Sequence, residues 1–211
     1  FVMGEYDGEG TLTFGTNLDN IYTGQFKKGN FEGKGVFSMS KATFTGLFKN
    51  NKAWFGTFKY VKGGSFTGFI HENGEDYNPE VGEHYDPNYT YLGWFDTLGK
   101  RGGYGTYVEK DGTQLEGKWI KGDLTGVAMY TFANKQSIIG KIDYKGNKIF
   151  GMISHEDKWY PGVMKADGSL AFADNGVDVT EYNTAYKEAA EYLAASRAAY
   201  KATMDKAPVI K

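Results

Sequence analysis

A short pattern centred on one glycine recurs along this chain at steps of 22, 22, 25, 24, 23 and 22 residues. In each copy a large apolar residue stands two positions before the glycine and another stands two positions after it. The seven copies are Tyr22-Thr-Gly24-Gln-Phe26, Phe44-Thr-Gly46-Leu-Phe48, Phe66-Thr-Gly68-Phe-Ile70, Tyr91-Leu-Gly93-Trp-Phe95, Leu115-Glu-Gly117-Lys-Trp119, Ile138-Ile-Gly140-Lys-Ile142 and Tyr160-Pro-Gly162-Val-Met164. A fixed period of this size predicts a repeat array, in which each repeat packs mainly on its neighbours.

The segment 22–37, YTGQFKKGNFEGKGVF, contains the most complete copy of the unit. Tyr22, Gly24 and Phe26 alternate with polar residues, so a strand here places all three on one face of a sheet. The following Lys-Lys-Gly-Asn predicts a turn, and the next glycine pair predicts the return strand of a β-hairpin. Because glycine has no Cβ, we expect it to leave a slot for an aromatic ring from the adjoining repeat.

This combination of Y-x-G-x-F, a turn glycine and a G-x-G pair resembles the MORN repeat (membrane occupation and recognition nexus). The resemblance covers roughly residues 4–172 and is strongest in 22–37, 91–107 and 115–130, while residues 4–14 match the second half of a unit. It implies a mainly β fold, an elongated single-layer antiparallel meander with one hairpin per repeat, used as a scaffold or interaction platform.

The pattern changes after Gly176, where DVTEYNTAYKEAAEYLAASRAAYKATMDKA begins two residues later. Asp178 and Glu181 form a predicted capping box, and Pro208 closes an amphipathic helix of about 28 residues. Its apolar stripe comprises Tyr182, Tyr186, Ala189, Leu193, Ser196 and Tyr200. We therefore divide the chain into a repeat array, 1–176, and a C-terminal helix with its tail, 177–211.

The residue that follows each repeat glycine lies on the second face of the predicted sheet. Along the chain these residues are Gln25, Leu47, Phe69, Trp94, Lys118, Lys141 and Val163. Leu47, Phe69 and Trp94 form an apolar stripe, which is unfavourable in water. At about 9.6 Å per hairpin and about 1.5 Å per helical residue, the helix would reach back about four repeats.

We therefore predict that Phe69 and Trp94 receive Tyr182, Tyr186, Leu193 and Tyr200 from the helix of the same chain. The alternative is that the stripe, the helix or both bind another protein chain.

The segment 71–90, HENGEDYNPEVGEHYDPNYT, is predicted to be an acidic loop inserted between two repeats. Its acidic residues are Glu72, Glu75, Asp76, Glu80, Glu83 and Asp86. This segment, which also holds His71 and His84, is the best candidate for a metal site, and its carboxylate oxygens would suit calcium, but the spacing does not match an EF-hand loop. We expect a solvated loop, or a contact for a basic partner, and predict no metal.

Composition excludes several classes of function. The formal net charge is −2 and there is no block of lysine or arginine, which argues against nucleic acid binding and makes any membrane contact indirect. The absence of cysteine excludes disulfides and thiolate metal sites. No Walker loop, catalytic triad or zinc-binding helix motif is present, so we predict no enzymatic activity and no cofactor. Because the sequence begins at Phe1, targeting signals are left open.

The sequence thus predicts a non-catalytic scaffold or adaptor that contacts other protein chains in a larger assembly. The resemblance implies a cytoplasmic location, in a cytoskeletal, ciliary or membrane-adjacent setting. Two alternatives of other classes stay open: an accessory recognition module of a larger enzyme, such as a methyltransferase or lipid kinase, and a phosphoinositide-binding module. Homodimerisation through the terminal repeats or the helix also stays open.

Overall fold

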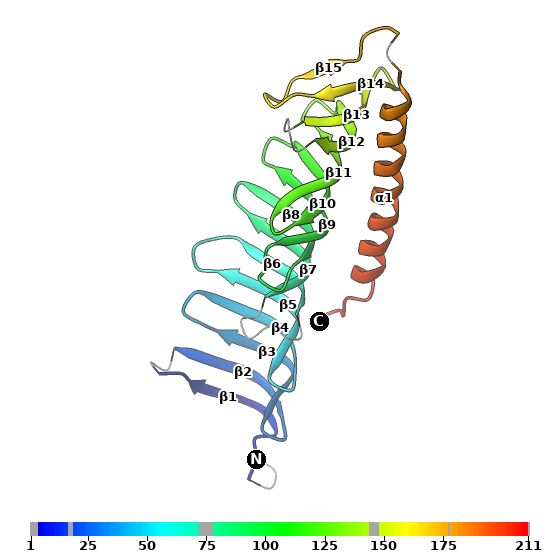
Figure 1. Cartoon of the computed structure of the whole chain (residues 1–211). Coiled ribbons are helices and arrows are strands. Elements are labelled where there is room, and N and C mark those ends of the chain that lie inside the picture. The colour runs from blue at the N-terminus through cyan, green and yellow to red at the C-terminus, as the bar shows by residue number, and fades with distance from the viewer. Residues whose placement is uncertain (1–3, 17–18, 72–77, 144–147, 177, 211) are drawn as a thin grey trace. The chain divides into compact units, whose positions relative to one another are not determined.

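The described residues form an antiparallel β-meander followed by one α-helix (Figure 1). The computed structural model describes residues 4–16, 19–71, 78–143, 148–176 and 178–210. In this part of the chain there are fifteen strands, and their order in the sheet is their order in the sequence. The predicted fold class, mainly β hairpins with one C-terminal helix, is confirmed.

The chain divides into two compact units. The first comprises Phe1–Pro87, Phe95–Gly99 and Met204–Lys211, and the second comprises Asn88–Trp94 and Lys100–Thr203. The strands of the first unit are β1 (Gly8–Phe14), β2 (Asn20–Lys27), β3 (Asn30–Ser38), β4 (Ala42–Lys49), β5 (Lys52–Tyr60), β6 (Ser65–Ile70) and β7 (Pro79–Asp86).

The second unit holds the remaining strands and the helix. They are β8 (Tyr89–Phe95, whose last residue is counted with the first unit), β9 (Arg101–Glu109), β10 (Gln114–Ile120), β11 (Asp123–Thr131), β12 (Ser137–Asp143), β13 (Lys148–His155), β14 (Lys158–Met164), β15 (Leu170–Phe172) and α1 (Thr180–Met204).

Several hairpins close through two turn residues with positive φ, the geometry that matches the twist of paired strands. Between β2 and β3 the pair is Lys28 and Gly29, with φ of 50° and 76°. Between β4 and β5 it is Asn50 and Asn51, with φ of 49° and 66°. Asparagine tolerates this region better than most residues, so a hairpin forms even where the turn glycine is lost.

Glycines face one another across neighbouring strands and form a continuous column in each unit. In the first unit the register pairs Gly10 with Gly24, Gly24 with Gly35, Gly35 with Gly46, Gly46 with Gly56, Gly56 with Gly68 and Gly68 with Gly82. In the second unit the register pairs Gly105 with Gly117, Gly117 with Ala128, Ala128 with Gly140, Gly140 with Gly151 and Gly151 with Gly162. A one-residue slip would reverse both faces of a strand, so this column marks the correct register.

Aromatic rings lie over the glycine column. A Cβ added to Gly35 would lie 2.5 Å from the ring of Tyr22, and one added to Gly56 would lie 2.6 Å from the ring of Phe44. Both rings belong to the first strand of the same hairpin. The expected slot therefore exists, but it holds a ring of its own repeat and not one from the adjoining repeat.

The phenol group of the covering tyrosine is also fixed by a hydrogen bond. The Tyr22 hydroxyl donates to the carbonyl of Gln25 at 2.8 Å, and the Tyr91 hydroxyl donates to the carbonyl of Trp94 at 3.0 Å. Each ring thus spans the glycine of its own strand and ends on the backbone just beyond it. Tyr22 and Tyr91 are both fully buried.

The prediction that residues 71–90 form an acidic loop is wrong over much of that segment. Residues 79–86 form β7, which pairs antiparallel with β6 and sets Gly82 opposite Gly68. From Gly82 onward the strand alternates despite its acidic residues, because Glu83 and Tyr85 are exposed while Gly82 is buried and His84 is half-buried. Pro79 is its first residue, a position where proline is tolerated in a sheet.

We predict that Gly35→Ala destabilises the protein by about 2 kcal/mol or more, because the new methyl group would overlap the Tyr22 ring in a packed core. Urea denaturation measures the change. Gly10→Ala is the matched control: Gly10 stands in the same column, but its nearest neighbour would be the Phe26 ring at 3.2 Å. Equal losses for the two variants would contradict the ring-over-glycine explanation.

Stability should fall in alkaline solution. Burial, followed by the charges of Glu9 and Glu32, raises the pKa of Tyr22 to about 12, and burial also raises the pKa of Tyr91. The native state therefore disfavours ionised tyrosine, so its stability is complete below the unfolded pKa of about 10 and declines as pH rises toward 12. Unfolding followed across this range by phenolate absorbance measures the decline, which should be smaller in Tyr22→Phe. A stability that is constant to pH 12 would refute the prediction.

Candidate functional site: apolar faces of the sheet

Helix α1 begins beside Asp178, whose carboxylate accepts hydrogen bonds from the Thr180 backbone N–H at 2.9 Å and the Thr180 hydroxyl at 2.6 Å. These bonds lower the pKa of Asp178, the side-chain bond most strongly. An aspartate here satisfies a helix N–H that has no partner within the helix and complements the helix dipole. The predicted capping box paired Asp178 with Glu181, whereas the hydrogen bonds to Asp178 come from Thr180, the first residue of α1.

The buried face of α1 packs against the second face of the sheet in the second unit (Figure 1). Ala185, Ala189 and Leu193 recur at four-residue steps and are buried. Ala189 and Leu193 share a cluster with Tyr104 of β9 and Ile139 of β12. The small alanine side chains let the helix backbone approach the strands closely.

Aromatic contacts extend this packing along the helix. The ring centroids of Tyr182 and Phe150 are 4.2 Å apart, those of Tyr186 and Trp159 are 5.6 Å apart, and those of Tyr200 and Trp94 are 5.4 Å apart. Pairs at such distances add to the stabilisation from buried area. The structure thus brings together Trp94, Tyr182, Tyr186, Leu193 and Tyr200 among the predicted residues.

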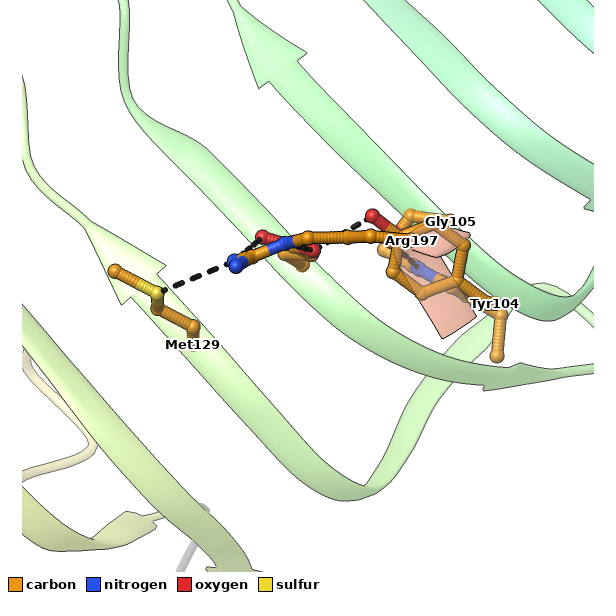
Figure 2. A network of polar contacts seen from close by, with 6 residues as sticks. Tyr104, Gly105, Met129 and Arg197 are labelled. Carbon is orange, nitrogen blue, oxygen red and sulfur yellow. Dashed lines mark hydrogen bonds and ion pairs between the residues drawn. The ribbon is translucent and has the colours of Figure 1, made fainter. Parts of the chain in front are cut away.

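A polar network anchors the last third of the helix (Figure 2). Arg197 donates from Nε to Glu116 Oε1 and from Nη2 to Glu116 Oε2, both at 2.6 Å. The Tyr104 hydroxyl donates to the same Oε1 at 2.6 Å. Figure 2 shows the Arg197 side chain extended toward Met129, whose sulfur lies 3.8 Å from Nη2.

This network shifts the pKa values of two of its side chains. The hydrogen bond to Glu116 raises the pKa of the Arg197 guanidinium, while burial and then the Glu116 bond raise the pKa of Tyr104 to about 12. A planar guanidinium bound to both carboxylate oxygens fixes distance and orientation together. The network therefore sets the position of α1 along the sheet. A second ion pair, Lys141 to Glu188 at 2.6 Å, is about half exposed and contributes less.

The first unit carries its own apolar surface, which we call the open surface and define as Leu47, Trp54 and Phe69. All three side chains are half-buried. Phe55 supports them from the same face, with its ring centroid 4.9 Å from that of Phe69. Trp54 occupies the extra position of a β-bulge opposite Leu47 and Phe48.

A recess of about 490 Å³ adjoins the open surface. Leu47, Phe48 and Trp54 form its apolar wall, and Glu32 and Lys49 stand at its rim with Gly33. Apolar walls with a few charged groups at the edge are typical of surfaces that bind other molecules. Phe69, which was predicted to receive the helix, contacts Trp54 and Phe55 in the first unit.

The predicted acidic residues are distributed differently from the expectation. Glu72, Glu75 and Asp76 lie outside the described residues. Glu80, Glu83 and Asp86 belong to β7, and of these Glu83 is exposed. His71 Nε2 lies 3.2 Å from the Phe95 carbonyl oxygen.

No group of three or more His, Asp and Glu side chains suited to a metal ion occurs within 4–16, 19–71, 78–143, 148–176 and 178–210. Over the same ranges, the structure contains no helix with the length and apolarity that a membrane span requires.

Sequence reasoning missed four residues that receive the helix: Tyr104, Ile139, Phe150 and Trp159. Three of them, Tyr104, Ile139 and Phe150, directly precede a glycine of the column, as Phe55 and Val81 do in the first unit. The register places such a residue opposite the residue that follows the neighbouring glycine, as with Phe55 opposite Leu47 and Phe69. Both positions together define the second face, so the signal was present in the sequence.

Three segments of the chain match the family model of the MORN repeat: residues 1–18, 22–41 and 97–114. These three segments are MORN repeats. The matched segments contain the most regular glycine spacing. Residues 115–130, which also resemble the repeat strongly in sequence, are not among them. Comparison with curated proteins finds no significant match. The remaining hairpins keep the MORN register without matching the model, as in the pair of Gly140 and Gly151.

We predict that Leu193→Ala lowers the free energy of unfolding by about 2–4 kcal/mol, because Leu193 is fully buried between the helix and the sheet. Thermal and urea unfolding measure the loss. Leu98→Ala is the matched control, since Leu98 is 75% exposed in a turn and should change stability by less than about 0.5 kcal/mol. If Leu193→Ala is as stable as the wild type, the helix does not depend on this packing.

Proposed function

We propose that this protein is a non-catalytic scaffold or adaptor that binds other protein chains of a larger assembly through the open surface. MORN repeats are in general repeat or recognition modules, and that general assignment supports the proposal. The specific proposal rests on one observation: Leu47, Trp54 and Phe69 gather on one face of the first unit, beside a recess with charged residues at its rim.

The chemistry of the open surface suits a protein partner. Trp54 and Phe69 supply large, rigid apolar areas, and tryptophan is among the residues that dominate binding energies at interfaces. Glu32 and Lys49 at the rim supply one charge of each sign, which favours a matched polar edge over a purely apolar ligand. Glu83, exposed on β7, adds a negative charge for a basic group of the partner.

The second unit contains a contact of the same kind, between the sheet and the helix. There the same face of the sheet binds α1 through Trp94, Tyr104 and Ile139. Leu47 and Phe69 follow their repeat glycines as Trp94 follows Gly93. We therefore infer a partner that presents aromatic or aliphatic side chains. The proposed setting is a cytoskeletal, ciliary or membrane-adjacent assembly, as the MORN repeats suggest.

The proposal is tested by affinity purification of the intact protein from its native source with lysine crosslinking and mass spectrometry. We expect one partner to crosslink to Lys49 or Lys52, which flank the turn between β4 and β5. Leu47→Asp should reduce recovery of that partner at least about tenfold, because it places a charge in the apolar contact.

Val61→Asp serves as the matched control, because Val61 is 76% exposed in the same unit and lies away from the open surface. It should leave recovery unchanged. Recovery that is insensitive to Leu47→Asp, or crosslinks confined to other lysines, would contradict binding through the open surface. Sedimentation of the purified protein would identify a second copy as the partner.

A further inference from the structure

Arg101, the first residue of β9, stands where two other repeats have an apolar side chain. Phe31 and Leu124 occupy the same place: all three residues lie two positions before a glycine of positive φ, which itself lies two positions before the glycine column. The backbone agrees, because the Phe31 carbonyl accepts from the Asn51 N–H at 3.0 Å and the Arg101 carbonyl accepts from the Gly122 N–H at 2.9 Å. Arg101 therefore puts a cation at a core position of the repeat.

The guanidinium of Arg101 lies over three aromatic rings. Its Cζ atom is 4.5 Å from the ring centroid of Trp119, 5.0 Å from that of Tyr107 and 5.9 Å from that of Tyr91. A cation over ring faces at these distances is attracted by their negative charge. The rings thus hold the guanidinium in place while the side chain stays half-buried.

The N–H donors of this guanidinium have no acceptor within the described part of the chain. The ion pairs found there involve Lys141, His155 and Arg197, and Arg101 makes no side-chain hydrogen bond. In the same ranges no half-buried side chain has a fully buried nitrogen without a hydrogen bond, so the nitrogens of Arg101 reach solvent. Stacking uses the face of the guanidinium, whereas its donors lie in its plane and stay available at the edge.

The sequence contains only two arginines, Arg101 and Arg197, and the second shows which group suits the first. Arg197 donates to both carboxylate oxygens of Glu116 at 2.6 Å. A flat carboxylate matches the planar fork of donors, so two parallel hydrogen bonds form. Within the described residues Arg101 has the same fork, already oriented by rings, but no carboxylate to fill it.

We propose that Arg101 binds a carboxylate of an acidic segment on a partner protein. The carboxylate accepts two N–H bonds from the edge of the guanidinium, as Glu116 does from Arg197. Because three rings already hold the guanidinium, little side-chain freedom is lost on binding, which favours affinity. This site lies in the second unit and does not rest on the function proposed for the open surface of the first.

The test uses the full chain with a fluorescein-labelled hexaglutamate peptide, and hexaglutamine as the uncharged control. Fluorescence anisotropy should show saturable binding of hexaglutamate at protein concentrations up to about 1 mM in low salt. Binding should weaken at about 0.5 M salt, because salt screens the charges. Hexaglutamine should not bind.

Arg101→Phe should weaken hexaglutamate binding at least about tenfold. The fold should persist, because phenylalanine is the residue at the equivalent position 31, and thermal unfolding checks this. Arg101→Lys should also bind more weakly than the wild type, because it keeps the charge but loses the planar fork. Lys165→Gln is the matched control: it removes one positive charge from an exposed turn of the same unit and should bind like the wild type.

Chemical modification gives a readout that needs no variant. Phenylglyoxal reacts with arginine side chains, and peptide mapping by mass spectrometry separates the two arginines of this chain. Hexaglutamate at about three times its Kd should slow the modification of Arg101 about fourfold, because about one quarter of the sites stay free. Arg197, already bound to Glu116, should react at an unchanged rate.

The proposal is overturned if hexaglutamate does not bind, if Arg101→Phe or Arg101→Lys binds as tightly as the wild type, or if the peptide does not protect Arg101 from phenylglyoxal. An equal loss of binding in Lys165→Gln would show attraction to bulk charge and would also overturn it. Displacement of the peptide by inorganic phosphate more readily than by citrate at equal ionic strength would overturn the assignment to a carboxylate.

Discussion

The ring of one side chain lying over a pair of glycines is the contact that makes this sheet possible. Tyr22 can cover Gly24 and Gly35 only because neither has a Cβ, and the Tyr22 hydroxyl then reaches the Gln25 carbonyl. The same contact recurs with Phe44 over Gly46 and Gly56. It fixes the register of the hairpins that contain it, and the register in turn decides which residues appear on the second face. Packing on one face thus determines the chemistry available on the other.

The second face is where the two units differ. In the second unit it binds α1 through Leu193 and through the Arg197–Glu116–Tyr104 network, so its apolar residues are covered. In the first unit Leu47, Trp54 and Phe69 remain half-buried. The packing of rings on glycines does not constrain the residues that follow the repeat glycines, because those residues do not contact the ring. Substitution there can change binding without changing the fold.

The repeat array and the helix were predictable from sequence because each rests on local periodicity. The strand β7 was not, because its acidic residues conceal the alternation of the exposed Glu83 and Tyr85 with Gly82 and His84. The receivers Tyr104 and Phe150 were not recognised because their place on the second face follows from pairing between strands, which one strand read alone does not show. Trp54 joins the open surface through a bulge, an irregularity of pairing that has no simple sequence signal.

The loss of rings in the later repeats explains why the helix covers that unit. There Ala128 replaces a column glycine, and Ile138, Ile149 and Ile153 pack with it where the first unit has aromatic rings. These strands also carry Val127, Ile139 and Met152 on the second face, so they are apolar on both sides. A sheet of this kind needs cover on its second face as well, in contrast to one with a solvated face. Helix α1 covers that face with small residues that allow close packing. The C-terminal helix thus supplies the cover that the degenerate repeats require.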